Sequence, residues 1–174
     1  MGIEIERKFL LASDGWRDAA HEVVVMAQGY LNDLHAVDSG AMNASVRVRI
    51  EGEQARLNIK SRELGASRQE FDYRIPMADA RALLALCVGG VIDKRRHLVQ
   101  HAGHLWEIDE FLGDNAGLVV AEIELDHEDE AFEHPTWLGA EATHAARYYN
   151  LALASRPYSQ WDEAERLASD IKER

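Results

Sequence analysis

The chain of 174 residues is poor in the features that would tie it to a membrane or to an oxidising compartment. Its single cysteine, Cys87, cannot form an intrachain disulfide, which excludes the disulfide-stabilised scaffolds typical of small secreted proteins. No apolar run approaches the ~20 residues that span a bilayer. The N-terminus also lacks the basic and apolar regions of a secretory signal. These absences predict a cytoplasmic protein without a membrane partner.

Positive charge is scarce as well. The chain has 19 lysines and arginines against 31 aspartates and glutamates, a formal net charge of −12, which argues against binding to nucleic acid. The bases are nonetheless concentrated between Arg47 and Arg96, so a small anionic substrate is compatible with the sequence. No GxxxxGK, HExxH or CxxC motif occurs, and the sites that these motifs build are not expected.

The most informative segment that is present is Ile3–Leu10, in which charged and apolar residues alternate. Because successive side chains of a strand point to opposite faces, Glu4, Glu6 and Lys8 share one face. Two carboxylates about 7 Å apart on a strand suit hard cations, and an ammonium in the same row suits a phosphate. A similar row recurs in residues 121–125, and the two rows together predict an ionic site.

Patterns of alternation and turn residues predict an α+β fold with one domain over residues 1–174. Strands are expected at Ile3–Leu11, Glu22–Leu34, Ser45–Glu51, Ala55–Arg62, Arg68–Ile75, Val91–Gln100, His104–Leu112 and Leu118–Asp126. Helices are expected at Met77–Val88, closed by Gly89-Gly90, and from about residue 143, at Thr143–Ala154 and Ser159–Lys172. Eight antiparallel strands joined by short turns can close into a β-barrel with flanking helices, which leaves no exposed edge.

The later strands also carry charged side chains on one face. The rows are Arg47 with Arg49, Lys60 with Arg62, Lys94 with Arg96, Glu107 with Asp109, and Glu122 with Glu124. One interpretation is an open sheet whose polar face meets solvent. The other is a closed barrel with the charges inside, which is very unfavourable when empty but sensible around a polyanion with divalent cations.

These rows resemble the CYTH domain family, the triphosphate tunnel metalloenzymes. Glu4-Ile5-Glu6-Arg7-Lys8 is similar to the family's ExExK signature. The resemblance continues through Arg47-Val48-Arg49, Lys60, Lys94-Arg95-Arg96, Trp106-Glu107-Ile108-Asp109 and Glu122-Ile123-Glu124. It implies an eight-stranded tunnel that binds triphosphate-containing substrates together with Mg2+ or Mn2+.

The resemblance also implies roles for individual residues. The implied metal ligands are Glu4, Glu6, Asp109, Glu122 and Glu124. The implied phosphate-binding residues are Lys8, Arg47, Arg49, Lys60, Arg62, Lys94 and Arg96. Catalysis would involve Glu4, Glu6, Lys8 and Tyr30, where Tyr30 either packs in the core or, near Lys8, positions the attacking water.

The function expected from this resemblance is metal-dependent hydrolysis of inorganic triphosphate to pyrophosphate and phosphate. A thiamine triphosphatase or an adenylate cyclase of the same fold is the alternative within the family. A non-catalytic module that binds polyphosphate or nucleotide is the alternative of another class, and it is disfavoured because both glutamate pairs are present. The sequence leaves a homodimer open and does not fix the natural substrate.

Overall fold

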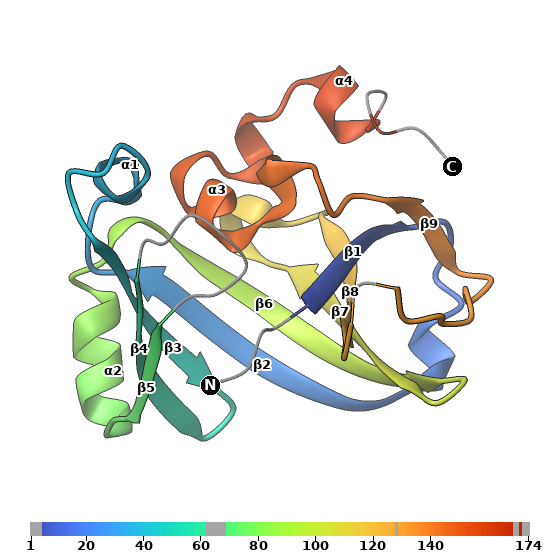
Figure 1. The fold of residues 1–174 in the computed structure, drawn as a ribbon, viewed down its shortest axis with the longest axis horizontal. Helices are drawn as coiled ribbons and strands as arrows, with labels where there is room; N and C mark the ends of the chain where they lie inside the picture. Colours follow the sequence, from blue (N-terminus) through green and yellow to red (C-terminus); the bar gives the residue numbers. More distant parts are fainter. Residues whose placement is uncertain (1–4, 62–68, 128, 169–170, 172–174) are drawn as a thin grey trace. The chain divides into compact units, whose positions relative to one another are not determined.

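The computed structural model describes residues 5–61, 69–127, 129–168 and 171, and its fold is α+β with a large antiparallel sheet of nine strands (Figure 1). The strands are β1 Ile5–Leu11, β2 Ala20–Tyr30, β3 Ala44–Glu51, β4 Gln54–Ser61, β5 Glu70–Arg74, β6 Val88–His101, β7 His104–Phe111, β8 Val119–Leu125 and β9 Leu138–Glu141. Their order in the sheet is β5-β4-β3-β2-β6-β7-β8-β1-β9. The α-helices are α1 Leu34–Asp38, α2 Met77–Leu84, α3 Asn150–Ser155 and α4 Glu163–Arg166.

The chain divides into two compact units. The main part of the first unit is Val25–Asp93, and the second unit takes in the described residues of Glu4–Val24 and Lys94–Arg174. The boundaries fall inside β2 and β6. Each unit has its own hydrophobic cluster.

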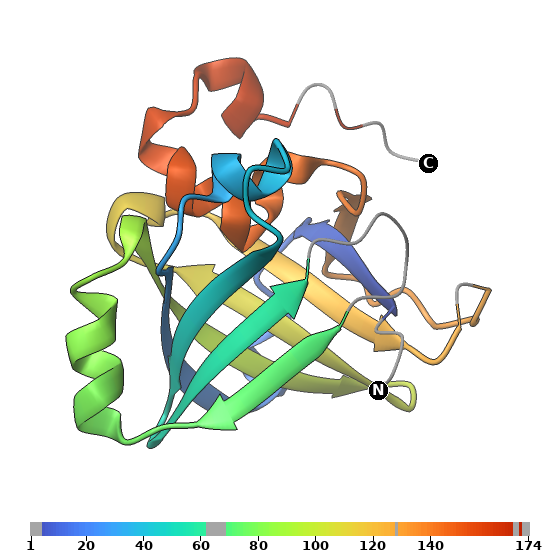
Figure 2. The same ribbon diagram turned by 60° about the vertical axis from the view of Figure 1, so that its left-hand side comes forward.

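The first unit is a sheet with one apolar and one polar face. Val48 and Ala55 lie on the apolar face and pack with Ala80 of α2, which runs beside β3 and β4 (Figure 2). The polar face carries Arg47 opposite Asn58 in the β3–β4 register. The period of two along each strand produces this separation, and it leaves the basic side chains away from the helix.

The second unit has an aromatic core on one face of β1, β7 and β8. Phe9 and Trp106 meet edge to face with ring centroids 5.7 Å apart, and Trp137 meets Trp106 at 5.4 Å. All three are nearly inaccessible to solvent. The residues between them along the strands point to the opposite face, which is the charged one.

The structure corrects several predicted element boundaries. The sheet has nine strands rather than eight, because Leu138–Glu141 adds to the edge of β1. The helix predicted from Met77 ends at Leu84, and Gly89-Gly90, predicted to close it, lies inside β6, where Gly89 has φ +79°. The helix α1 was not predicted; its N-cap Asp33 accepts a hydrogen bond from the His35 amide at 2.9 Å.

The C-terminal helices are shorter than predicted. Only α3 is α-helical within the predicted Thr143–Ala154, because the Thr143 hydroxyl bonds to other parts of the chain and Tyr149 is extended. Within the second predicted helix, a new N-cap at Asp162 starts α4. None of the helices in the described residues has the length and apolar character that crossing a membrane requires.

Candidate active site

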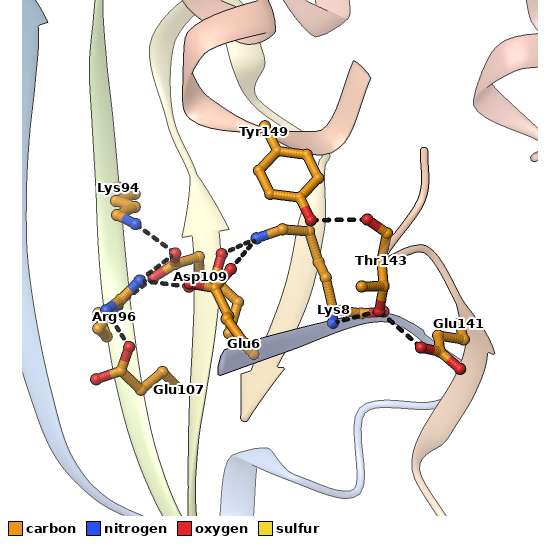
Figure 3. Close-up of polar contacts among 10 residues, drawn as sticks. Glu6, Lys8, Lys94, Arg96, Glu107, Asp109, Glu141, Thr143 and Tyr149 are labelled. Atoms are coloured by element: carbon orange, nitrogen blue, oxygen red, sulfur yellow. Dashed lines mark hydrogen bonds and ion pairs between the residues drawn. The ribbon is translucent and has the colours of Figure 1, made fainter. Parts of the chain in front are cut away.

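Charged residues of four neighbouring strands share one face of the second unit (Figure 3). In the β1–β8 register Glu6 lies opposite Glu124 and Lys8 opposite Glu122. Strand β7 places Glu107 opposite Glu122, and β6 places Arg96 opposite Asp109. Directly opposed residues of an antiparallel pair lie on the same face. The register therefore gathers residues that are more than 100 positions apart in the chain, such as Lys8 and Glu122.

Lys8 is buried between two carboxylates. Its Nζ lies 3.0 Å from Glu6 Oε1 and donates a hydrogen bond to Glu122, and only 3% of its side chain is exposed. Burial alone would lower the pKa of Lys8, but the charges of Glu122 and Glu6 outweigh burial and raise it. The buried ammonium of Lys8 is therefore held in its charged form on this face of the sheet.

Arg96 and Lys94 converge on Asp109, which is inaccessible to solvent. Arg96 donates from Nε and Nη2 to the two carboxylate oxygens at 2.7 Å each, and Lys94 Nζ donates to Oδ2. Burial would raise the pKa of Asp109, but the two cations outweigh it and hold the value at about 2. Lys94 is itself only 1% exposed, and burial lowers its pKa. Both oxygens of Asp109, which was predicted to be a metal ligand, thus accept hydrogen bonds from Arg96 or Lys94.

Two further carboxylates complete the cluster. Glu122 accepts from Lys8 through one oxygen and from Arg96 Nη2 at 2.9 Å through the other. Glu107 accepts from Arg96 Nη1. Burial raises the pKa of Glu107, Arg96 opposes the rise, and the neighbouring charges of Glu122 and Asp109 add to it. Three cations thus face four carboxylates, so most of the charge is paired and the carboxylates exceed the cations by one.

The donor set fits a hard divalent cation. Glu124 is exposed and lies directly opposite Glu6. The Cβ atoms of directly opposed residues in an antiparallel pair are about 5 Å apart in general. A divalent cation between the two carboxylates would relieve their mutual repulsion. Over the part of the chain that the structure describes, no three acidic, histidine or cysteine side chains form a ready-made metal site. The predicted ligand Glu4 lies outside the described residues.

The remaining predicted residues lie in the first unit, on its polar face. Tyr30 stands opposite Arg47, and burial raises the pKa of the Tyr30 hydroxyl although Arg47 opposes the rise. Lys60 Nζ lies 3.6 Å from Glu70 Oε1, and Arg49 Nη2 lies 3.5 Å from a glutamate oxygen on its own strand. The predicted phosphate ligand Arg62 lies outside the described residues.

Sequence reasoning missed two contributors to the charged face of the second unit. Glu107 is in the same strand row as Asp109, so its position was visible in the alternation even though no role was assigned to it. Tyr149 places its ring 4.8 Å from Lys8 Nζ. No periodic signal could have found it, because Tyr149 precedes a short helix after an irregular segment.

Comparison with known proteins identifies relatives over nearly the whole chain. The family model of the CYTH domain matches residues 2–156. The inorganic triphosphatase of Acetivibrio thermocellus is 42% identical over 164 residues, which cover 94% of this chain and 100% of the relative. The inorganic triphosphatase of Nitrosomonas europaea is 36% identical over 154 residues, 87% of this chain and 96% of the relative. A crystal structure of an inorganic triphosphatase superposes with a TM-score of 0.68 at 32% identity, covering 88% of this chain and 95% of that one.

Proposed function

The chain belongs to the CYTH domain family, and from this premise we propose that it hydrolyses inorganic triphosphate to pyrophosphate and phosphate. The observation that carries the proposal is the partly buried cluster of three cations and four carboxylates on one face of the second unit. Buried charge is costly for a fold, and departures from the rules of stable folding are expected at functional sites. Two relatives that are inorganic triphosphatases over nearly their whole lengths make triphosphate the favoured ligand.

Within the proposed site, Lys8 and Arg96 bind phosphate oxygens. Arginine suits this role because its planar guanidinium donates paired hydrogen bonds, and the Lys8 ammonium adds a compact charge. Both cations now contact carboxylates, so the substrate competes with Glu6, Glu107 and Glu122 for them. Asp109 accepts two parallel hydrogen bonds from Nε and Nη2 of Arg96, and this pair keeps the guanidinium in place while that exchange occurs.

Glu6, Glu122 and Glu124, together with Glu4, would hold the divalent cation on which this family typically depends. When bound, Mg2+ or Mn2+ supplies charge neutralisation of the transferred phosphoryl group. The residues of the chain contribute positioning and electrostatic stabilisation, the two terms that dominate catalysis of phosphoryl transfer. Because the carboxylates outnumber the cations in the cluster, a cation added there relieves repulsion.

The proposal extends to the first unit. Arg47, Arg49 and Lys60, together with Arg62, are proposed to bind further phosphate oxygens, and Tyr30 is proposed to position the attacking water. A closed tunnel is proposed from the family resemblance. Support comes from their common polar face and from the charge rows of the sequence. The small-molecule triphosphate is then the partner of the protein.

A panel of substrates tests the function. Purified protein is incubated with tripolyphosphate, ATP or thiamine triphosphate in Mg2+ or Mn2+, and phosphate release is measured. We expect tripolyphosphate to have the highest kcat/KM, with pyrophosphate and phosphate formed in equal amounts. Faster turnover of ATP or thiamine triphosphate would replace the proposal by an organic triphosphatase. Binding of tripolyphosphate without turnover in either metal would replace it by a non-catalytic binding module.

A further inference from the structure

Lys8 is held at three points by one segment that follows β9. The Lys8 amide donates to Thr143 Oγ1 at 3.0 Å, and the Lys8 carbonyl accepts from the Ala142 amide at 2.8 Å. The ring of Tyr149 lies 4.8 Å from Lys8 Nζ. Both the backbone and the ammonium of Lys8 are therefore fixed by residues 142–149, which we call the positioning segment.

The positioning segment is itself braced. The Tyr149 hydroxyl donates to the Thr143 carbonyl at 2.7 Å, which ties the aromatic end of the segment to its polar end. Thr143 Oγ1 donates to Glu141 Oε1 at 2.7 Å, and Glu141 accepts two hydrogen bonds from Arg7, from Nε at 2.9 Å and Nη2 at 2.5 Å. The bracing starts and ends on β1, so the segment cannot shift without breaking several hydrogen bonds together.

From this geometry we infer that Tyr149 is a positioning residue for Lys8, acting through its aromatic ring. An ammonium is attracted to the face of an aromatic ring within about 6 Å of its centroid, and the attraction grows when both groups are removed from water. The ammonium of Lys8 also contacts the carboxylates of Glu6 and Glu122. The ring holds the ammonium without taking up one of its N–H donors, which therefore stay available to a phosphate oxygen. A carboxylate or amide at position 149 would instead add another hydrogen-bond acceptor beside Lys8.

The inference deepens the proposed function and rests on it, because Lys8 is a proposed phosphate ligand there. The hydroxyl and ring of Tyr149 are separated by two variants. Tyr149→Phe keeps the ring and loses the bond to Thr143, whereas Tyr149→Leu loses both. Tyr158→Phe is the matched control, since Tyr158 lies outside the positioning segment and its ring meets Trp161 at 5.1 Å.

Steady-state kinetics with tripolyphosphate give the first readout. We expect Tyr149→Leu to lower kcat about tenfold, the size expected for one desolvated cation–π contact, with a smaller change in KM. Tyr149→Phe should stay within about threefold of wild type, and Tyr158→Phe should match wild type. Equal losses of kcat in Tyr149→Leu and Tyr149→Phe would overturn the role of the ring.

A second readout does not depend on turnover. In protein labelled with 13C-lysine, the ε-methylene signals of Lys8, assigned with Lys8→Met, should be shifted upfield by the ring current of Tyr149. The shift should persist in Tyr149→Phe and disappear in Tyr149→Leu; its persistence in Tyr149→Leu would overturn the inference. If Tyr149→Leu does not fold, Tyr149→Met serves instead as the variant without an aromatic ring: loss of the upfield shift supports the inference, and its persistence overturns it. Absence of triphosphatase activity in the wild type would reject the proposed function while these spectra still decide the role of Tyr149.

Discussion

At the scale of single residues, Lys94 and Asp109 form a buried ion pair next to the more exposed charges of the site. Both side chains are nearly inaccessible to solvent, and each neutralises the other, with Arg96 as a second donor to Asp109. A buried ion pair contributes little over an apolar pair, but removing one member leaves an uncompensated charge. Lys94 was predicted to bind phosphate and Asp109 to bind the metal. Because Asp109 also accepts from Arg96, we infer that the pair orients Arg96, which reaches the more exposed Glu107.

Asp109→Asn tests this orientation through the dependence of stability on pH. The pKa of Asp109 is held at about 2, below its ordinary 3.8, so the ionised group stabilises the fold above pH 3.8 and this contribution is lost as the pH falls toward 2. We expect Asp109→Asn to lower the free energy of unfolding at pH 7 by about 3–5 kcal/mol. The variant should also show a shallower loss of stability between pH 4 and pH 2.

Urea unfolding at a series of pH values measures both effects. Asp114→Asn is the matched control, because Asp114 is exposed in the turn before β8. An Asp109→Asn variant as stable as the control at pH 7 would contradict the assignment of Asp109 to a buried ion pair.

Glu122 is the residue on which the cations of β1 and β6 meet, since it accepts from both Lys8 and Arg96. Glu122→Gln keeps the shape and removes the charge that would bind a divalent cation. We expect tripolyphosphate hydrolysis to fall by about 100-fold or more at limiting Mg2+, with the circular dichroism spectrum unchanged. Glu133→Gln, at an exposed glutamate of the same unit, is the control. Near-normal turnover of Glu122→Gln would argue against a metal at this end of the site.

At the scale of elements, Gly29 of β2 allows the junction between α2 and β6 to pack closely on the strand. A Cβ at Gly29 would lie 2.6 Å from Cys87 Sγ and 2.9 Å from Cys87 Cβ, both closer than side chains approach. Cys87, the single cysteine of the chain, thus has a packing role: its side chain fills the space beside Gly29. Gly29 fits this position because any side chain there would meet Cys87.

Gly29→Ala should therefore destabilise the protein by about 1–3 kcal/mol through overpacking. Cys87→Ala removes the sulfur but leaves the Cβ at 2.9 Å, so the double variant should recover only part of that loss. The interaction energy from the double-mutant cycle, measured by urea unfolding, is expected to be clearly non-zero. Gly15→Ala is the control, since the nearest atom to its Cβ would be Ser13 Oγ at 3.6 Å, an ordinary contact. Additive effects of the two substitutions would show that the clash is relieved elsewhere.

At the scale of the whole molecule, a net charge of −12 coexists with a site proposed to bind a polyanion. The two are compatible because the bases are concentrated on particular strands, whereas much of the acid lies in the C-terminal third. Ligand binding to the native state alone raises stability by about 2.7 kcal/mol at a hundredfold excess over Kd.

We therefore expect tripolyphosphate with Ca2+, chosen to limit turnover, to raise the melting temperature by several degrees. Orthophosphate should raise it much less, because one phosphate cannot reach basic residues on several strands. Differential scanning fluorimetry with each anion, at matched ionic strength and with sulfate as the control anion, measures the effect. An equal shift with orthophosphate would indicate a generic anion effect rather than a site for the chain of three phosphates.

The sequence by itself determined the strands and their charged faces. All eight predicted strands are present, since alternation with a period of two is a local property that needs no knowledge of neighbours. The same alternation predicted that Glu6 and Lys8 share one face of their strand, and that Lys94 and Arg96 share one face of theirs. The family resemblance was also legible from these rows, and the match to the CYTH domain over residues 2–156 confirms it.

The tertiary structure decided what each charge contacts. Strand β9 has only four residues and little periodic signal, and it forms because it pairs with the edge of β1. Lys8 and Thr143 are 135 positions apart, and nothing in the local pattern of either one predicts their hydrogen bond. The tyrosine over Lys8 is Tyr149, at the end of an irregular segment that was predicted to be helical. Periodicity fixes the face to which a side chain points, whereas its partners depend on register and on irregular backbone, which only the folded chain sets.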